Sequence, residues 1–143
     1  GGDPSSGLGL VHDTVETSIT WERWPEFDHM VRRALQQALD EVCGGGTLNC
    51  RFTHVYVDGP APYYTFTGTQ PGLNNEHAHQ VKVAASEAII KGGGTITHHH
   101  AVGRLHRPWY DVQRPNLFAQ ALKAVKKSVD PSGVMNPGVL IDP

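Results

Sequence analysis

Three consecutive histidines are the residues of this sequence best suited to chemistry. His98, His99 and His100 follow three glycines at 92–94 and a β-branched run at 95–97. An imidazole titrates near neutral pH and ligates metals, so such a cluster can carry protons, bind a metal ion or line a cofactor. The triplet is internal and lies in a patterned segment, which argues against an affinity tag. We therefore treat it as a candidate site.

The run at 95–97, Thr-Ile-Thr, predicts a short strand leading into the triplet. β-Branched residues favour strands, and glycines on both sides permit tight turns. If the strand continues through the triplet, alternation places His98 and His100 on one face and His99 on the other.

The rest of the chain predicts the elements that position these groups. Hydrophobic periodicity and turn residues indicate a hairpin between helices. In chain order we expect an extended segment at 8–21, a helix from 24 that Gly44 ends, strands at 47–58 and 63–67, a helix from Asn74 or Asn75 to about 91, the short strand at 95–97 and a last helix between Pro115 and Asp130. This order predicts the α+β class: an antiparallel sheet with helices packed on one face, ferredoxin-like in part, followed by a C-terminal helical segment.

Composition narrows the possible functions. The chain has 143 residues, enough for one domain, with 12 Lys and Arg against 14 Asp and Glu and a net charge of −2. This balance gives no basic footprint for nucleic acid, and no apolar run approaches the roughly 20 residues of a membrane span. Cys43 and Cys50 favour reduced thiols, so we expect an intracellular protein, cytoplasmic or peripheral to a membrane.

Motifs for holding a cofactor are missing from the sequence. Neither glycine run, 44–46 or 92–94, has the GxGxxG or Walker spacing of a phosphate loop. There is no Gly-x-Ser-x-Gly elbow and no pair of CxxC motifs. Residues 1–9 are typical of a linker, a cloning remnant or the edge of a truncation. The chain alone therefore has no self-evident cofactor cradle.

Four segments together resemble a known family. The segments are Glu16-Thr17-Ser18 with Trp21; 50–56 with Tyr63 seven residues after Tyr56; Gly93 to Gly103 with the triplet; and Asp130-Pro131 with Asn136-Pro137-Gly138. They resemble the C-terminal region of FAD-linked oxidases, flavoproteins of the vanillyl-alcohol-oxidase type, and among these the alkyldihydroxyacetonephosphate synthases. The resemblance runs from about residue 10 to the end of the chain.

The resemblance implies a C-terminal fragment of a flavoenzyme, with FAD bound mainly by an upstream domain. Residues 10–103 would form part of the substrate (cap) domain, and 104–143 a segment that packs against the FAD-binding domain. The implied reaction exchanges the acyl chain of acyl-dihydroxyacetone phosphate for a fatty alcohol, in ether-lipid synthesis. Peripheral membrane contact and a homodimer are further implied partners, and the isolated chain would neither hold FAD tightly nor turn over substrate.

The resemblance also assigns roles to individual residues. The catalytic candidates are Tyr63, His98, His99 and His100; the cofactor-binding candidates are Thr97, His100 and Asn136; the substrate-binding candidates are Arg51, Arg104 and Arg107. A phenol and an imidazole can exchange protons with substrate, and guanidinium groups suit phosphate or carboxylate. Whether Arg104 and Arg107 bind substrate or lie in a solvated loop stays open, as does whether Asn136 approaches the flavin or stabilises a turn.

Two rival interpretations stay open. The hairpin loop is similar to the metal-binding motif of FAD-linked 2-hydroxy-acid dehydrogenases of the lactate or glycolate type, with His54 as first ligand and His99 in place of a glutamate. Tyr63 stands roughly where that motif has its second histidine, so two of the three expected ligand types are missing. The other rival is a non-catalytic α+β module whose histidines sense pH or bind a metal.

Overall fold

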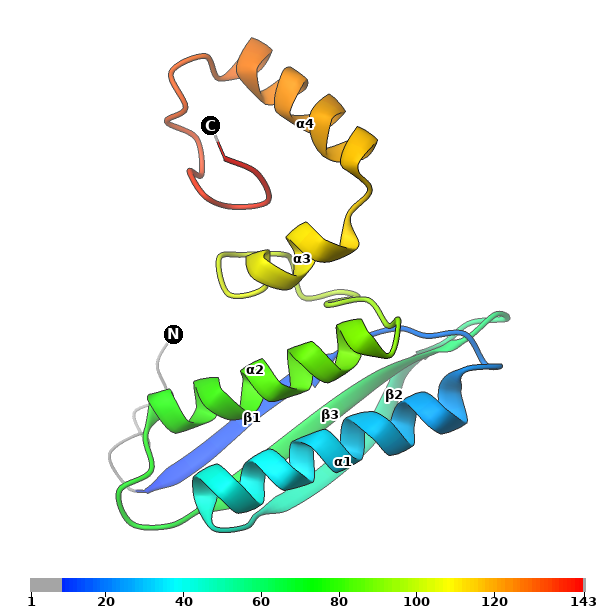
Figure 1. The fold of residues 1–143 in the computed structure, drawn as a ribbon, viewed down its shortest axis with the longest axis vertical. Coiled ribbons are helices and arrows are strands. Elements are labelled where there is room, and N and C mark those ends of the chain that lie inside the picture. Colours follow the sequence, from blue (N-terminus) through cyan, green and yellow to red (C-terminus); the bar gives the residue numbers. More distant parts are fainter. Residues whose placement is uncertain (1–8, 143) are drawn as a thin grey trace. The chain divides into compact units, whose positions relative to one another are not determined.

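The computed structural model describes residues 9–142, and the chain divides into two compact units, one ending at His99 and one beginning at His100. The expected division lay after Gly103. The first unit contains β1 (Leu10–Glu16), α1 (Trp24–Cys43), β2 (Thr47–Val55), β3 (Pro60–Thr69) and α2 (Asn75–Lys91), and the second contains α3 (Arg107–Gln113) and α4 (Asn116–Val129) (Figure 1). The interpretation of residues 1–9 falls, apart from Gly9, outside the described residues.

The first unit is built on a three-stranded antiparallel sheet in the order β1-β3-β2. β3 pairs with both neighbours, and its Tyr63 lies opposite Glu16 of β1 and Arg51 of β2. Because β1 and β2 finish where β3 begins, the residues at these strand ends share one end of the sheet. The predicted α+β class, with an antiparallel sheet and helices on one face, is confirmed.

Helices α1 and α2 cover the same face of the sheet (Figure 1). Alternation along β3 turns Tyr64 and Phe66 toward these helices, where both are fully buried, and turns Tyr63 away. The helices bury the stripes that their periodicity predicts, including Phe27, Val31, Leu35, Leu39, Val81, Ala85 and Ile89. Each such side chain contributes about 1.5–3 kcal/mol, so this core fixes the sheet's orientation under the helices.

The helix ends follow the signals in the sequence. Pro25 lies in the first turn of α1, and Gly44 ends the helix in the left-handed region at φ 69°. Asn74 caps α2 by accepting from the backbone N–H groups of Glu76 and His77. The His77 imidazole completes a capping box by accepting from the Asn74 backbone N–H, so this half-buried histidine has a structural role.

Three local predictions were wrong. The run at 95–97 is a loop, because the Thr95 N–H makes one bond to the Ser18 carbonyl and no strand ladder forms there among the described residues. The hairpin loop lies earlier in the chain than expected, at 56–59, since β2 ends at Val55, β3 begins at Pro60 and the Tyr56 N–H donates to the Gly59 carbonyl. Helix α3 was not predicted, because seven residues are too few to show a periodicity.

The second unit has little buried surface of its own. The predicted last helix, α4, is confirmed, but Phe118, Val125 and Val129 of its apolar stripe are 53, 57 and 76% exposed. The tail is fastened to α3, since Arg114 donates to the Leu140 carbonyl and Ile141 is buried. Within the part of the chain that the structure describes, no helix has the length and apolar character to cross a membrane.

Candidate functional site

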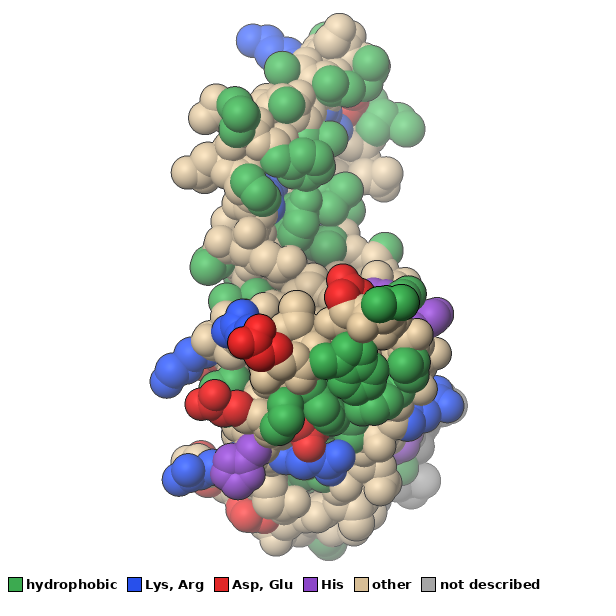
Figure 2. All heavy atoms as spheres, turned by 90° about the vertical axis from the view of Figure 1, so that its right-hand side faces the viewer, with side chains coloured by type: hydrophobic (Ala, Val, Ile, Leu, Met, Phe, Trp, Pro, Cys, Tyr) green, Lys and Arg blue, Asp and Glu red, His purple; other side chains and the backbone are tan. Residues whose placement is uncertain are grey.

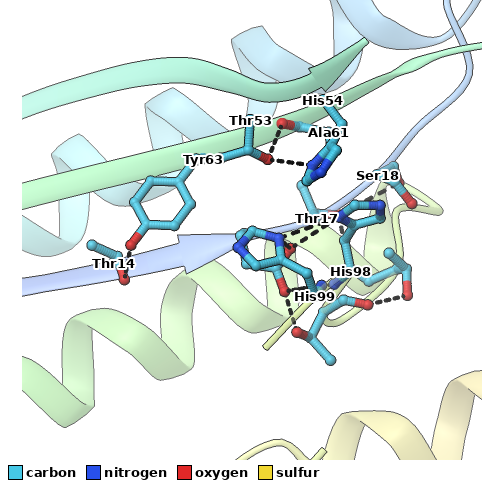
Figure 3. Close-up of polar contacts among 12 residues, drawn as sticks. Thr14, Thr17, Ser18, Thr53, His54, Ala61, Tyr63, His98 and His99 are labelled. Atoms are coloured by element: carbon cyan, nitrogen blue, oxygen red, sulfur yellow. Dashed lines mark hydrogen bonds and ion pairs between the residues drawn. The ribbon is translucent and has the colours of Figure 1, made fainter. Parts of the chain in front are cut away.

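The end of the sheet where β3 begins brings together a phenol and an imidazole that lie far apart in the sequence (Figure 3). The Tyr63 hydroxyl donates to Thr14 Oγ1 at 3.2 Å. The ring of His99 lies nearly parallel to the phenol, with ring centroids 6.2 Å apart and planes at 19°. Two groups able to exchange protons therefore lie side by side on the face of the sheet that the helices leave uncovered.

Glu16 is the buried group that holds the histidine loop in place. Its side chain is 1% exposed. Oε1 accepts the backbone N–H of His98 at 2.6 Å, that of His99 at 2.9 Å and the hydroxyl of Thr97. Oε2 lies 3.2 Å from Nδ1 of His99 and 3.7 Å from Nδ1 of His98. One carboxylate thus binds the loop's backbone and faces its imidazoles.

The loop reaches Glu16 because its preceding residues pack closely on β1 and α1. Thr17, fully buried, donates its hydroxyl to the Thr95 carbonyl at 2.6 Å. A Cβ on Gly94 would lie 2.6 Å from Cζ of Phe27, so only glycine allows this approach. The glycines before the triplet therefore serve packing, which brings the histidines beside the strand end.

His98 and His99 lie beside each other, with their Nδ1 atoms 3.3 Å apart. Their placement on opposite faces was expected only if a strand continued through the triplet, and it does not apply because the segment is a loop. Nε2 of His98 also lies 2.9 Å from the Tyr56 hydroxyl. His54, near the end of β2, joins them with ring centroids 5.0 Å from His98 and 5.7 Å from His99.

These three histidines are the group among the described residues that could hold a metal ion. One ligand nitrogen from each of His54, His98 and His99 lies within 4.8 Å of the others. Three neutral imidazoles suit a first-row divalent ion such as zinc, with a further position open to solvent or substrate. The sequence proposed His54 and His99 as weak candidates and did not include His98.

Arg51 is the candidate arginine that lies at this end of the sheet. Its guanidinium carbon lies 4.9 Å from the centroid of the Tyr63 ring, within the range of a cation–π contact. Arg51 is exposed, so its N–H groups face solvent above the phenol. A positive charge beside the phenol favours an anionic substrate group at this position.

Tyr64, the residue next to Tyr63 on β3, is unsuited to proton transfer. It is fully buried under α1, and its hydroxyl donates to Asp28 at 2.9 Å. Burial, with Cys50 and Asp28 nearby, raises the pKa of the Tyr64 phenol well above its usual range. Arg32 holds Asp28 through both carboxylate oxygens at 2.9 Å, so this cluster stabilises the core.

The glycine runs do not form a cradle for the phosphates of a dinucleotide. The N–H groups of Gly92, Gly93 and Gly94 donate to carbonyls at the end of α2. The N–H groups of Gly44 and Gly45 both donate to the Leu39 carbonyl. Donors already bound to backbone carbonyls cannot hold phosphate. What the site's residues do fit is the edge of a planar, hydrogen-bonding ring, through the Tyr63 phenol and the His99 imidazole.

The other candidates belong to the second unit. Arg107, 12% exposed, pairs with Asp111 at 2.7 Å and Asp142 at 3.1 Å. Arg104 donates to the Pro137 carbonyl at 2.8 Å. These contacts tie α3 and its preceding loop to the tail. His100 begins this unit, and Asn136, at a φ of 45°, accepts from the Val139 N–H in the tail's turn.

Glu16 is the residue of this site that sequence reasoning missed. It was noted only as part of a family-like motif, and its contacts are to residues more than 80 positions away. The available signal was a carboxylate flanked by two β-branched residues, Val15 and Thr17, in a segment expected to be extended. A charged side chain that enters a core needs partners, so that pattern indicates a buried polar contact.

Comparisons with known proteins match the sequence of this chain to one family. The family described as FAD linked oxidases, C-terminal domain, matches residues 5–140. An alkyldihydroxyacetonephosphate synthase from Caenorhabditis elegans is 30% identical over 138 residues, which cover 94% of this chain and 23% of that protein. A glycolate oxidase subunit from Bacillus subtilis is 35% identical over 92 residues, which cover 62% of this chain and 19% of that protein.

A solved structure of alkyldihydroxyacetonephosphate synthase has a similar fold, with a TM-score of 0.55 at 19% identity; the match covers 90% of this chain and 20% of that one. This chain thus spans about a fifth of the length of these relatives. The family binds FAD mostly through its N-terminal domain, and its members are oxidoreductases or transferases. The match over residues 5–140 shows that this chain belongs to the FAD-linked oxidases, as their C-terminal domain.

Proposed function

We propose that this chain is the substrate-facing part of an FAD-dependent transferase of the alkyldihydroxyacetonephosphate synthase type. Such an enzyme exchanges the acyl chain of acyl-dihydroxyacetone phosphate for a fatty alcohol. The observation that carries the proposal is the pairing of Tyr63 with His99, above the buried carboxylate of Glu16. The similarity to the Caenorhabditis elegans synthase extends over 94% of this chain, against 62% for the glycolate oxidase subunit, and this supports the synthase activity over that of the oxidase.

The exchange needs a proton removed beside a carbonyl and a proton delivered to the departing carboxylate. Tyr63 and His99 have the chemistry for both steps, because a phenol and a neutral imidazole each offer one donor and one acceptor. Both lie at the same end of the sheet, so one group can act on the substrate while the other returns the proton. His98, bound to Tyr56, extends the chain of polar groups away from the pair.

Arg51 supplies the positive charge of the proposed site. Its guanidinium lies over the Tyr63 ring and is exposed, so it can pair with the phosphate or the leaving carboxylate of a substrate lying across the phenol. Arg107 is held by Asp111 and Asp142, and we assign it to the internal structure of the second unit. Arg104 has the same kind of role through the Pro137 carbonyl.

FAD, when bound, supplies the electrophile for the substrate carbon without net redox change. We propose that an upstream domain holds its phosphates, since both glycine runs of this chain use their N–H groups in helix ends. Thr97, His100 and Asn136 remain our candidates for contacts to the flavin. The exposed apolar stripe of α4 is suited to pack against that domain. We place the enzyme inside the cell, in the cytoplasm or at a membrane surface where fatty substrates collect.

The test uses the longer protein that includes the FAD-binding domain. With FAD bound, we expect it to incorporate a labelled fatty alcohol into acyl-dihydroxyacetone phosphate and to release the fatty acid. Absence of ether product from a protein that retains FAD would contradict the proposal. The isolated 143-residue chain is the control, because neither of its glycine runs forms a cradle for the FAD phosphates, and it should neither turn yellow nor form product.

A second candidate function is oxidation of a 2-hydroxy acid. The cluster of His54, His98 and His99 favours it, because a bound divalent metal could hold the carboxylate and hydroxyl of such a substrate. The similarity to a glycolate oxidase subunit from Bacillus subtilis also supports this second function. Reduction of a dye by the FAD-bound protein with lactate or glycolate, together with a stoichiometric metal, would establish this function in place of the first.

A further inference from the structure

We propose that Thr14 is a positioning residue, whose hydroxyl holds the phenol of Tyr63 in the place where it meets the substrate. The inference rests on the proposed function in one respect, since Tyr63 is there a group that exchanges a proton. It adds the residue that orients this phenol, and none of the sequence motifs includes it.

Thr14 is the diagonal neighbour of Tyr63 in the sheet. The residue directly opposite Tyr63 on β1 is Glu16, and Thr14 lies two positions earlier on the same face, opposite Thr65. A diagonal neighbour lies about 7–8 Å away, a distance that an aromatic side chain can span. The Tyr63 hydroxyl donates to Thr14 Oγ1 at 3.2 Å, so the phenol leans from β3 across to β1 (Figure 3).

The group directly opposite Tyr63 is engaged with another segment. Oε1 of Glu16 accepts two backbone N–H groups and a hydroxyl from the loop at 97–99. This oxygen therefore serves to hold the histidine loop. The hydroxyl of Thr14, on the same face of β1, is the acceptor that receives the phenol.

The bond to Thr14 restrains a ring that has polar groups packed along it. The guanidinium carbon of Arg51 lies 4.9 Å from the centroid of the Tyr63 ring, and the nearly parallel ring of His99 lies at 6.2 Å. Both contacts depend on the plane of the phenol, which its two side-chain torsions set. Threonine suits the acceptor position, because its β-branched side chain is restricted in χ1 and gives the hydroxyl a defined direction.

The sheet offers a matched control for the alternative that Thr14 serves only as a good strand residue. Thr65 lies directly opposite Thr14 on the same face, and both side chains are half-buried. Of these two threonines, both in the described part of the chain, Thr14 receives the bond from the phenol. Thr→Val keeps the β-branched shape and the preference for strands while it removes the hydroxyl. Variants at 14 and 65 therefore test the contact to Tyr63.

The first measurement is made on the 143-residue chain and needs neither flavin nor substrate. The chain has four tyrosines, so labelling with ¹³C at tyrosine Cζ gives four NMR signals, and Tyr63→Phe identifies that of Tyr63. The Cζ shift responds to the hydrogen bond of the hydroxyl. We expect the Tyr63 signal to move in Thr14→Val and to keep its parent position in Thr65→Val and in Thr14→Ser, which restores a hydroxyl.

Two results of this measurement would overturn the proposal. One is an unmoved Tyr63 signal in Thr14→Val, and the other is an equal movement in Thr65→Val. Urea unfolding of the same samples shows that each variant is folded. If Thr14→Val does not fold, Thr14→Ala removes the same hydroxyl and takes its place.

The second measurement is a double-mutant cycle in the longer FAD-bound protein. We expect Thr14→Val to lower kcat by up to about 10²-fold with little change in KM, because a misplaced reacting group impairs the chemical step. Added to Tyr63→Phe, the same change should have no further effect on kcat, since Thr14 acts through the phenol. Thr65→Val should retain kcat.

The two measurements separate the positioning role from the proposed reaction. A further loss of kcat in the double variant, or a kcat that Thr14→Val leaves unchanged, would overturn the positioning role. A parent protein that holds FAD but forms no ether product, with the Tyr63 signal moved as expected, would overturn the proposed function alone.

Discussion

The ring of His99 lies beside that of Tyr63 at 6.2 Å between centroids, although the two residues come from a loop and from a strand that the sequence places 36 positions apart. The contact depends on Glu16, which pairs with Tyr63 across β1 and β3 and holds the backbone of His99. The pairing of Glu16 with Tyr63 in the sheet therefore determines where both the phenol and the imidazole lie. The predictions below separate the contributions of these groups from those of the surrounding core.

Tyr63→Phe should reduce turnover far more than it reduces stability. The hydroxyl makes one bond to Thr14 in a half-buried position, which is worth about 0.5–1.5 kcal/mol. If the hydroxyl carries a proton in the reaction, it should raise kcat by a factor of roughly 10²–10⁴. The measurement is kcat of the longer FAD-bound protein, with urea unfolding of the same samples.

The control is the adjacent tyrosine. Tyr64→Phe loses a bond to a carboxylate, Asp28, and should cost about 1.5–3 kcal/mol of stability while kcat is retained. If the two variants lost activity in parallel with their stability, Tyr63 would have no chemical role beyond that of Tyr64.

Removal of metal ions should leave ether synthesis unchanged. Nδ1 of His99 lies 3.2 Å from the buried carboxylate of Glu16, and Nε2 of His98 lies 2.9 Å from the Tyr56 hydroxyl, so a nitrogen of each ring that a metal would otherwise use already has a polar neighbour. We expect dialysis against a chelator to preserve kcat, and His54→Ala to preserve it as well. Activity that is lost on chelation and restored by zinc would show that the three imidazoles act as ligands, as the 2-hydroxy-acid alternative requires.

Gly94→Ala should destabilise the first unit by about 1–3 kcal/mol, the usual cost of overpacking. The added Cβ would lie 2.6 Å from Phe27 Cζ and 2.8 Å from the Thr17 hydroxyl, which holds the histidine loop. Gly103→Ala is the matched control, because nothing lies within 4 Å of its Cβ position, and it should change stability by less than about 0.5 kcal/mol. Equal unfolding midpoints in urea for the two variants would show that the approach of the loop to α1 does not depend on glycine.

The sequence predicted the elements of this fold in which a periodic pattern of apolar residues extends over many positions. Helices α1, α2 and α4 and the hairpin strands show such a pattern, because nine or more residues repeat an apolar stripe or an alternation. The run at 95–97 has the composition of a strand but joins no sheet among the described residues, and its hydrogen bonds include those to Ser18 and Glu16. Propensity favours a conformation only where a neighbouring strand completes the ladder.

The residue types of the site could be predicted from the sequence. Their arrangement in space could not. Tyr63 and the triplet were found because a phenol at a fixed spacing and clustered imidazoles are rare. Their relative placement came from non-local contacts of Glu16, which no local pattern encodes. The side-by-side placement of His98 and His99 likewise follows from the loop's anchoring, so alternation could not give it.

The tail's closing turn should loosen in acid, because it is built on one carboxylate. Asp130 accepts from Lys126 Nζ at 2.6 Å and from the N–H groups of Met135 at 3.0 Å and Val134 at 3.1 Å. The hydrogen bond from Lys126, with those from the two backbone groups, holds the pKa of Asp130 below its usual value. A depressed folded-state pKa stabilises the turn at every pH above the unfolded value of about 3.9, and that stability is lost as the pH falls through the folded pKa.

Amide hydrogen exchange measures this effect locally. After correction for intrinsic rates, we expect protection of the Val134 and Met135 amides to be constant from neutral pH down to about 4 and to fall below it, because protonation removes the acceptor charge. In Asp130→Asn the protection should be low and should not change with pH. The Ala119 amide, which donates to the Pro115 carbonyl in the first turn of α4, serves as the internal reference. Protection of all three amides that falls together in the parent chain would indicate loss of the whole second unit, and the turn would then not depend on Asp130 alone.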